Sequence, residues 1–367
     1  SGVVVNTHTA MKVPAVWGAV NFLAGTLAGL PLMTYRRSGA DRQKVSGGVA
    51  SLLHDAVNDE MSSFDWRKYT FEQCFTGGRA FTWIERNSSG TPINLWPLDP
   101  MKVTVRRERG RKYYEYREEG GTIRYEPGEI IDLPFMLTSD GLTHRGPIAS
   151  LADTIGLSIS ATEYGSRFFQ NGGVPPFAIT GSFQSGQSAK RASDDFDEAV
   201  RKAAKEDRQA LVLPTGLEIK QIGANPEDSQ LVELKRFLIE EIARIYSIPP
   251  TFLQDLTHGT FSNTEQEDLR LVKHTVKRWA EQFEQELNLK LFGRGRQSRF
   301  AELNMDGILR GDFATRMEGN ARAIMTGQLT PNEARRMDNR ESLANGDQLY
   351  IQGATVPLGT ESDNGEA

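Results

Sequence analysis

Two proline pairs constrain the fold of this chain more than any other feature of its sequence. Pro175-Pro176 follows an apolar stretch that runs into Asn171-Gly172-Gly173, and Pro249-Pro250 follows a second apolar stretch. Proline lacks a backbone N–H and its ring clashes with the preceding helical turn, so neither stretch can continue as a helix past its pair. The sequence therefore predicts two helices that end abruptly, with a separate unit between them.

The two predicted helices differ in their apolar faces. The first, at residues 150–171, has two stripes: Leu151, Ile155 and Ile159 on one, and Leu157, Ala161, Tyr164 and Phe168 on the other. One stripe suffices for a helix that packs on one side, so two stripes indicate contacts on both sides. The second helix begins near residue 226 and has one sustained face, made by Leu231, Leu234, Leu238, Ile242 and Ile245.

The unit between these helices and the region before them mix helices with strands. The unit reads as a strand at 177–180, a polar helix at 188–204 and strands at 210–213 and 217–222. Before it, we expect a helix at 13–30, a strand at 32–36, and a helix from 62 or 63 to 75 that buries Trp66, Tyr69, Phe71 and Phe75. Short β-rich runs between residues 80 and 134 predict an antiparallel meander.

The region after the second helix is largely helical. A polar loop at 251–263 precedes a long helix at 264–292, where Ser262 and Glu265 have capping-box spacing. Its expected seam is Leu269, Val272, Val276, Trp279, Phe283 and Leu287. A strand at 300–303 and helices at 312–325 and 331–337 follow, the last begun by a capping box of Thr330 and Glu333, and we expect the last fifteen or so residues to be a disordered tail.

Composition places the chain among large globular proteins. It has 367 residues, of which 38% are apolar and 25% charged, so we expect two or three domains of the α+β class. The single cysteine, Cys74, excludes an intrachain disulfide and zinc sites built on several cysteines. The sequence has neither an apolar run of about 18 residues nor a signal segment, so we expect a cytoplasmic protein without a membrane span.

The sequence lacks the common catalytic motifs. It contains no GxxxxGK[ST], GxGxxG, HExxH, GxSxG or CxxC, so we expect no catalytic residue, metal or cofactor. The alternative is a metal-dependent nuclease using Glu265, Asp268 and His274, with Glu267 beside them. Glu265 and Asp268 share a face, but His274 lies nearly two turns further along. A solvated helix start, where acids interact favourably with the helix dipole, is therefore the preferred interpretation.

The charge distribution argues against tight nucleic-acid binding. The net charge is −5, and tight binding of phosphates requires a basic surface. One basic run contains Arg106, Arg107, Arg109, Arg111 and Lys112 beside Tyr113, Tyr114 and Tyr116. We favour a protected hairpin edge whose tyrosines face the core over a nucleic-acid site. A second series is either a solvated face or a docking surface, because nearby acids balance it: Lys190, Arg191, Arg201, Lys202, Lys205 and Arg208.

Several strings, in this order, resemble the portal protein family of tailed bacteriophages that is named for phage HK97. They lie at residues 166–172, before the first proline pair, and at 238–250, 309–312, 327–335 and 345–347. Each string alone is weakly specific, but together they run through most of the chain. The ends of the chain depart from the family pattern.

The resemblance implies a ring, typically of twelve subunits, at one capsid vertex. It implies that residues 1–150 and 264–305 form a mixed α/β wing with the β meander and a long helix. Residues 151–173 and 225–250 would be a two-helix stem, 174–224 a small α/β clip, 306–350 a helical crown and 351–367 a tail. The expected partners are further copies of the chain, the terminase large subunit, a head-tail adaptor, the major capsid protein or scaffold, and double-stranded DNA, with no membrane.

The resemblance also assigns a function to the loop at 251–263, which corresponds to the tunnel loop that narrows the channel around DNA. The residues expected there are Leu256, Thr257, His258, Gly259, Thr260, Phe261, Ser262 and Asn263. The implied function is structural: a conduit for genome packaging and ejection, assembled in the host cytoplasm and retained in the virion. The weak net charge agrees with DNA that slides without being held. A different head-tail adaptor is the remaining alternative.

Overall fold

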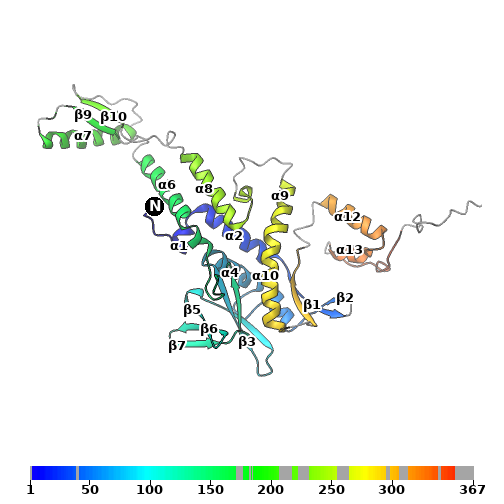
Figure 1. The fold of residues 1–367 in the computed structure, drawn as a ribbon. Helices are drawn as coiled ribbons and strands as arrows, with labels where there is room; N and C mark the ends of the chain where they lie inside the picture. Colours follow the sequence, from blue (N-terminus) through cyan, green and yellow to red (C-terminus); the bar gives the residue numbers. More distant parts are fainter. Residues whose placement is uncertain are drawn as a thin grey trace, which may run out of the picture. The chain divides into compact units, whose positions relative to one another are not determined.

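The structure is a computed structural model. It describes residues 2–38, 41–170, 177–181, 183, 185–205, 217–221, 231–253, 264–294, 298–305, 313–337 and 340–351. The chain divides into two compact units, Ser1–Leu303 and Asn304–Ala367. Helices and antiparallel sheets alternate through the first unit (Figure 1), which confirms the predicted α+β class.

The core of the first unit forms around helices α2 (Pro14–Gly29) and α4 (Ser63–Thr76), which follow the short helix α1 (Thr7–Ala10). Val16, Val20, Leu23 and Leu27, which recur at helical spacing on α2, are fully buried. Trp66, Phe71 and Phe75 of α4 are buried as expected, whereas Tyr69 is half-buried. Arg67 donates from Nε to the carbonyl of Ser63 at 3.0 Å and also bonds the carbonyl of Leu30. The guanidinium thereby satisfies a carbonyl that the end of α2 leaves free.

The long helix contains two π-helical turns that the apolar spacing did not predict. It runs through α9 (Thr264–Leu271), η5 (Val272–Val276), α10 (Lys277–Leu287) and η6 (Asn288–Phe292), with η5 and η6 π-helical. A π turn holds more residues than an α turn. One series of its buried side chains recurs every four residues, namely Leu271, Thr275, Trp279, Phe283, Leu287 and Leu291, and Val272, Val276 and Ala280 are buried beside it. The assignment of Leu269 to the seam was wrong, since its side chain is 56% exposed. The other predicted seam residues are buried as expected: Val272, Val276, Trp279, Phe283 and Leu287.

The β-rich region forms two three-stranded antiparallel sheets. One has the order β4 (Pro92–Leu98), β3 (Arg79–Arg86), β8 (Ile130–Pro134). The other is a meander of β5 (Val103–Glu108), β6 (Arg111–Glu118) and β7 (Gly121–Tyr125), entered through the short helix η1 (Pro100–Lys102). The predicted antiparallel meander is therefore confirmed for β5, β6 and β7, but it does not run through all of residues 80–134, because β3 takes β8 as its second neighbour.

A third sheet brings the two ends of the first unit together. Strand β1 (Leu32–Ser38) pairs antiparallel with β11 (Arg299–Leu303) on one edge and β2 (Asp41–Lys44) on the other, and helix α3 (Val49–His54) follows. The outer edge of β11 contacts the long helix, where Glu284 accepts the N–H of Leu303 at 2.7 Å. The amide of Asn288 accepts the N–H of Ala301 at 2.7 Å and donates to its carbonyl at 3.0 Å. Helix side chains thus occupy backbone groups that an edge strand would expose.

The remaining elements follow the predicted order. Helices α5 (Pro147–Ser150) and α6 (Ala152–Gln170) precede β9 (Phe177–Gly181), α7 (Gly186–Lys205) and β10 (Leu217–Gln221), and β9 pairs with β10. The predicted strand at 210–213 lies outside the described residues. Helix α8 (Leu231–Tyr246) and the 3-10 turn η2 (Pro250–Leu253) come next.

The second unit contains α12 (Phe313–Met325) and α13 (Pro331–Met337). The predicted capping box is confirmed: Thr330 Oγ1 accepts the N–H of Glu333 at 3.2 Å, and Glu333 accepts the N–H of Thr330 at 2.8 Å. The buried amide of Asn332 pairs with both backbone groups of Leu343, at 2.8 and 2.9 Å. The predicted tail lies almost wholly outside the described residues.

Candidate functional site

The first candidate surface is the helix pair of α6 and α8, which pack side by side (Figure 1). Gly165 of α6 faces Leu231 of α8: a Cβ on the glycine would lie 3.6 Å from the leucine Cδ2, so the two helices approach closely. Ile155 on α6 and Leu238 and Ile242 on α8 are buried. These residues close the inner face of the pair.

Outside the contact between α6 and α8, on what we call the outer face, large apolar side chains remain exposed at positions spread around both helices. The exposed fractions are 41% for Leu157 and 75% for Phe169 on α6, and 66% for Val232 and 53% for Phe237 on α8. Of the two stripes predicted for α6, the first is buried at Leu151 and Ile155. The second is buried at Ala161, half-buried at Tyr164 and Phe168, and exposed at Leu157. Exposed apolar side chains gathered on neighbouring elements mark an interaction surface.

The second candidate is the segment that leaves α8 and returns as α9. All eight residues predicted for the tunnel loop, 256–263, lie outside the described residues, but both flanks are described. On the outgoing side, Phe252 packs on Phe22 of α2 with ring centroids 5.1 Å apart. Thr251 Oγ1 donates to Glu267 on the returning helix at 2.6 Å. Both ends of the segment are therefore held together at one place.

A further contact anchors the end of α8 beside that segment. Ser247 adopts a left-handed backbone conformation, with φ of 56°, and its carbonyl accepts a hydrogen bond from the Thr275 hydroxyl in the first π turn. Tyr246 donates its hydroxyl to the carbonyl of Phe75 at 2.9 Å, and burial raises the pKa of this tyrosine. The helix end is thus fixed to the core of the first unit.

The basic series predicted as a docking surface lies partly on α7. Lys190 and Arg191 are exposed there. Arg201, Lys202 and Lys205 belong to the same helix, and Arg208 lies outside the described residues. Phe196 on the same helix is buried.

The acidic cluster at the start of the long helix is described only in part, because the side chain of Glu265 lies outside the described residues. Glu267 is engaged by Thr251, and Asp268 and His274 are exposed. Among the residues that the structure describes, no three His, Cys, Asp or Glu side chains come together as a metal would require. In the same described residues, no helix is both long enough and apolar enough to span a membrane.

The basic hairpin of β5 and β6 is mostly a protected edge, as predicted. Arg106 pairs with Glu115 across the strands at 2.7 Å, and Tyr114 is fully buried, with Tyr116 packed against the same apolar cluster. Tyr113 departs from the expectation that all three tyrosines face the core. It lies on the opposite face of β6, where the Arg124 guanidinium stacks 4.0 Å from its ring centroid.

A buried polar network that the sequence analysis missed joins β3, β6, β8 and the long helix. Asp132 accepts two bonds from Arg79 (2.7 and 2.6 Å), one from Lys112 (2.7 Å) and one from the Tyr114 hydroxyl (2.7 Å). Burial alone would raise the pKa of Asp132, but the bonds and charges of Arg79 and Lys112 lower it to about 2. The sequence did contain a sign of this network, because β3 and β8, which are otherwise largely apolar, each carry one of the paired charges, Arg79 and Asp132.

Comparisons with known proteins agree with this fold. A family model described as phage portal protein matches residues 14–339. The portal protein of Enterobacteria phage HK97 is 28% identical over 364 residues, which cover 96% of this chain and 85% of that protein. The probable portal protein of Streptomyces phage phiC31 is 28% identical over 363 residues, which cover 94% and 78%.

Solved structures share the fold. An HK97-family phage portal protein from Corynebacterium diphtheriae matches with a TM-score of 0.58 at 17% identity, covering 82% of this chain and 95% of that one. A chain in the neck of a native gene transfer agent particle, computed with C12 symmetry, matches with a TM-score of 0.62 at 18% identity, covering 92% and 94%. Since the family model spans most of the sequence, this chain belongs to the phage portal protein family.

Proposed function

We propose that this chain assembles into a closed ring at one vertex of a phage capsid and acts as the channel for genome packaging and ejection. Membership of the portal family supports this, as does the similar fold of chains in necks of C6 and C12 symmetry. In this proposal the stem consists of residues 151–173 and 225–250, and the clip of residues 174–224. The wing consists of residues 1–150 and 264–305, and the crown of residues 306–350. The ring assembles in the host cytoplasm and stays in the virion.

The observation that carries the ring is the outer face of the helix pair. Each of Leu157, Phe169, Val232 and Phe237 keeps at least two fifths of its surface exposed in one chain. Covering such side chains stabilises an assembly by about 25 cal/mol per Å² of apolar surface removed from water. In a closed ring, the same pair of helices on the next subunit covers this surface at every interface.

The test is direct imaging of the purified chain by negative stain, together with its mass by native mass spectrometry. A ring with a central hole is the expected result. A persistent monomer under conditions that favour assembly would contradict the proposal.

Within the ring, we place residues 256–263 around the DNA as a tunnel loop. The flanks support this, since Thr251, Phe252 and Glu267 hold both ends of the segment on a rigid base. The loop residues carry no charged side chain apart from protonated His258, so they would contact DNA by shape and transient polar contacts.

Deleting residues 259–262 tests this assignment. We expect packaging or genome retention to fail while the ring still forms. Deletion of four residues from the C-terminal end is the matched control. Normal packaging and genome retention after the loop deletion would contradict the tunnel-loop assignment. The proposal that the chain forms a ring would still stand.

The clip is proposed to dock the terminase large subunit and, later, a head-tail adaptor. Exposed Lys190 and Arg191 on α7 support a polar docking surface. Lys190→Glu with Arg191→Glu should weaken terminase binding in a pull-down with purified rings. Arg117→Glu, on the exposed end of β6, is the control. If the α7 double variant bound terminase as strongly as the Arg117→Glu control, this part of α7 would not be the docking surface.

A further inference from the structure

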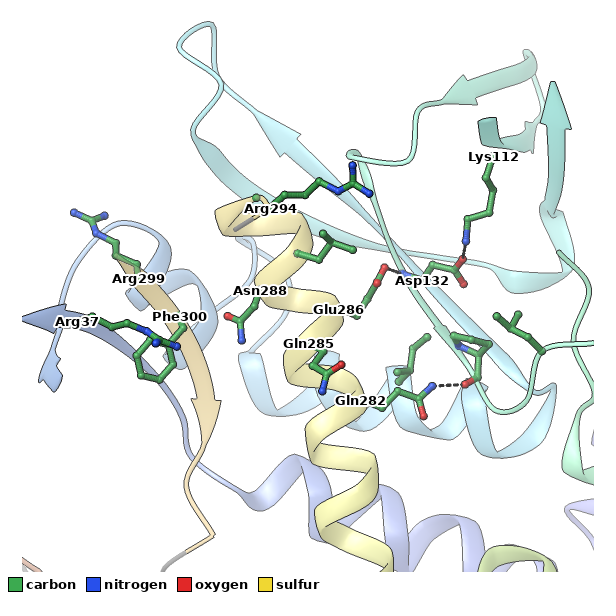
Figure 2. A pocket seen from close by; sticks show the side chains of 15 residues that line it. Arg37, Lys112, Asp132, Gln282, Gln285, Glu286, Asn288, Arg294, Arg299 and Phe300 are labelled. Carbon is green, nitrogen blue, oxygen red and sulfur yellow. Dashed lines mark hydrogen bonds and ion pairs between the residues drawn. The ribbon is translucent and has the colours of Figure 1, made fainter. Parts of the chain in front are cut away.

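A groove in the first unit has a chemistry that the proposed channel does not use. Its volume is about 880 Å³, within the range of about 300–1,000 Å³ that ligand sites occupy. Figure 2 shows the long helix along its floor, with Gln282, Gln285 and Asn288. One wall comes from β1 and β11, and the other from β8 and the residues that follow it.

The carboxylates in this groove are already bound. Asp132 is held by Arg79 and Lys112, as Figure 2 shows for Lys112. Glu286 lies 3.4 Å from Lys290 and accepts the backbone N–H of Asp132 at 2.9 Å. These acids therefore leave little negative charge with which to repel an anion.

Three arginines at the groove are not neutralised in this way. Arg37, Arg294 and Arg299 line it and are exposed, and none forms an ion pair with a carboxylate in the described part of the chain. The Arg37 guanidinium lies 5.1 Å from the centroid of the Phe300 ring, which steadies it without reducing its charge. In a chain with net charge −5, three arginines thus line one groove, with Arg37 on the Phe300 face of the β1–β11 sheet and Arg299 on the opposite face.

The groove also offers apolar surface next to these cations. Leu137 and Leu289, which line it, are both exposed large apolar residues. Gln285 is exposed on the floor and has no hydrogen-bond partner among the described residues, so its amide is available to a peptide backbone. A phosphodiester chain would use the arginines but has no group for the leucines. A peptide uses all three kinds of surface.

We propose that this groove binds a short acidic peptide segment of a partner protein, one in which carboxylates stand next to an apolar side chain. Guanidinium groups bind carboxylates through paired N–H donors. The leucines receive the apolar side chain, and the Gln285 amide contacts the backbone.

The test uses the full chain and a fluorescein-labelled peptide of alternating glutamate and leucine, with binding followed by fluorescence anisotropy. The variant replaces Arg37, Arg294 and Arg299 by glutamine. Because the variant removes three charged contacts, we expect affinity to fall about tenfold or more. Leu289→Asp, which removes the apolar contact, should weaken binding independently.

The matched control replaces three exposed arginines of the β5–β6 hairpin that do not line the groove, Arg109, Arg111 and Arg117, and should bind as the unchanged chain does. Three results would overturn the proposal. One is no peptide binding, or binding that the groove variants do not weaken. Another is equally strong, arginine-dependent binding of labelled oligothymidylate, which would indicate a phosphate site. The third is loss of oligomers in the triple variant, which would indicate that a second copy of the chain occupies the groove.

Discussion

The packing between α4 and the long helix differs sharply from the packing of α6 with α8. In the first region, Phe283 lies 5.6 Å from Trp66 and 5.1 Å from Phe71 between ring centroids, and Phe75 lies 5.0 Å from Trp279. All five rings are buried. The helix pair has a closed inner face and an open outer face. A single chain therefore buries all the large side chains of the aromatic core, whereas it leaves large apolar side chains of the helix pair exposed.

This difference separates folding from assembly. A region whose large side chains are all covered has its stability decided within one chain, so substitutions there change the free energy of unfolding. A region with uncovered apolar side chains gains its remaining stability from another molecule, so substitutions there change association. Four predictions test this separation.

The largest effect is expected at the aromatic core. Phe283→Ala removes a fully buried ring that two other rings contact, and such substitutions cost about 3–5 kcal/mol. Chemical denaturation of the purified chain measures the loss. Phe64→Ala, on the exposed side of α4, is the control and should cost far less. Similar losses for the two variants would contradict the claim that this core is complete.

The second effect is expected at the buried network. Asp132→Asn keeps the size of the side chain but removes the charge that Arg79, Lys112 and Tyr114 all donate to, and breaking a buried pair costs about 3 kcal/mol or more. The pKa of Asp132 is lowered from 3.8 to about 2, so its contribution is present above pH 3.8 and is lost as pH falls towards 2.

Denaturation at several pH values measures this contribution. The difference between the unchanged chain and Asp132→Asn should shrink as pH falls through that window. Asp59→Asn, at an exposed position, should show neither the loss nor its pH dependence. A loss that stayed constant down to pH 2 would mean that shape, and not charge, explains the effect.

These two sites also show what the sequence could and could not reveal about the fold. The helices of the core were predicted because apolar residues recur at helical spacing. The π turns were not, since they depend on which backbone groups bond. Nor did the spacing show that Leu271 is buried and Leu269 exposed. Strand positions were mostly predicted, but the pairing of β8 with β3 depends on a contact between distant segments, as does the Arg79–Asp132 pair.

The third effect is expected where the long helix meets β11. Burial raises the pKa of Glu284 from 4.5 to about 7, with smaller contributions from Glu302 and Glu281. The folded chain therefore binds the proton more tightly than the unfolded chain, and stability falls as pH rises from about 4.5 to about 7.

Glu284→Gln removes this pH dependence and keeps an oxygen that can accept the Leu303 N–H. The variant should match the unchanged chain near pH 4 and be more stable by about 2 kcal/mol at pH 8. Glu233→Gln, on an exposed position of α8, should show no such divergence. If Glu284→Gln were less stable at pH 8, the carboxylate would be stabilising β11 by more than burial costs it.

Candidate sites were harder to predict than the fold, for a related reason. The basic series on α7 was visible because its members are neighbours in the sequence. The groove was not, since Arg37, Lys112 and Arg294 come from three distant segments that only the fold brings together. The outer face of the helix pair was visible in part, as the second stripe of α6.

The smallest effect on the single chain, and the largest on assembly, is expected on that outer face. Phe237→Gln together with Leu157→Gln replaces two exposed apolar side chains by a residue that favours helices, so unfolding should change by no more than about 0.5 kcal/mol. Native mass spectrometry should nevertheless show loss of the ring. Met101→Gln, an exposed apolar residue outside the pair, should leave both unchanged. Because the core would be intact in all three chains, a ring that persists in the double variant would mean that subunits associate through another surface.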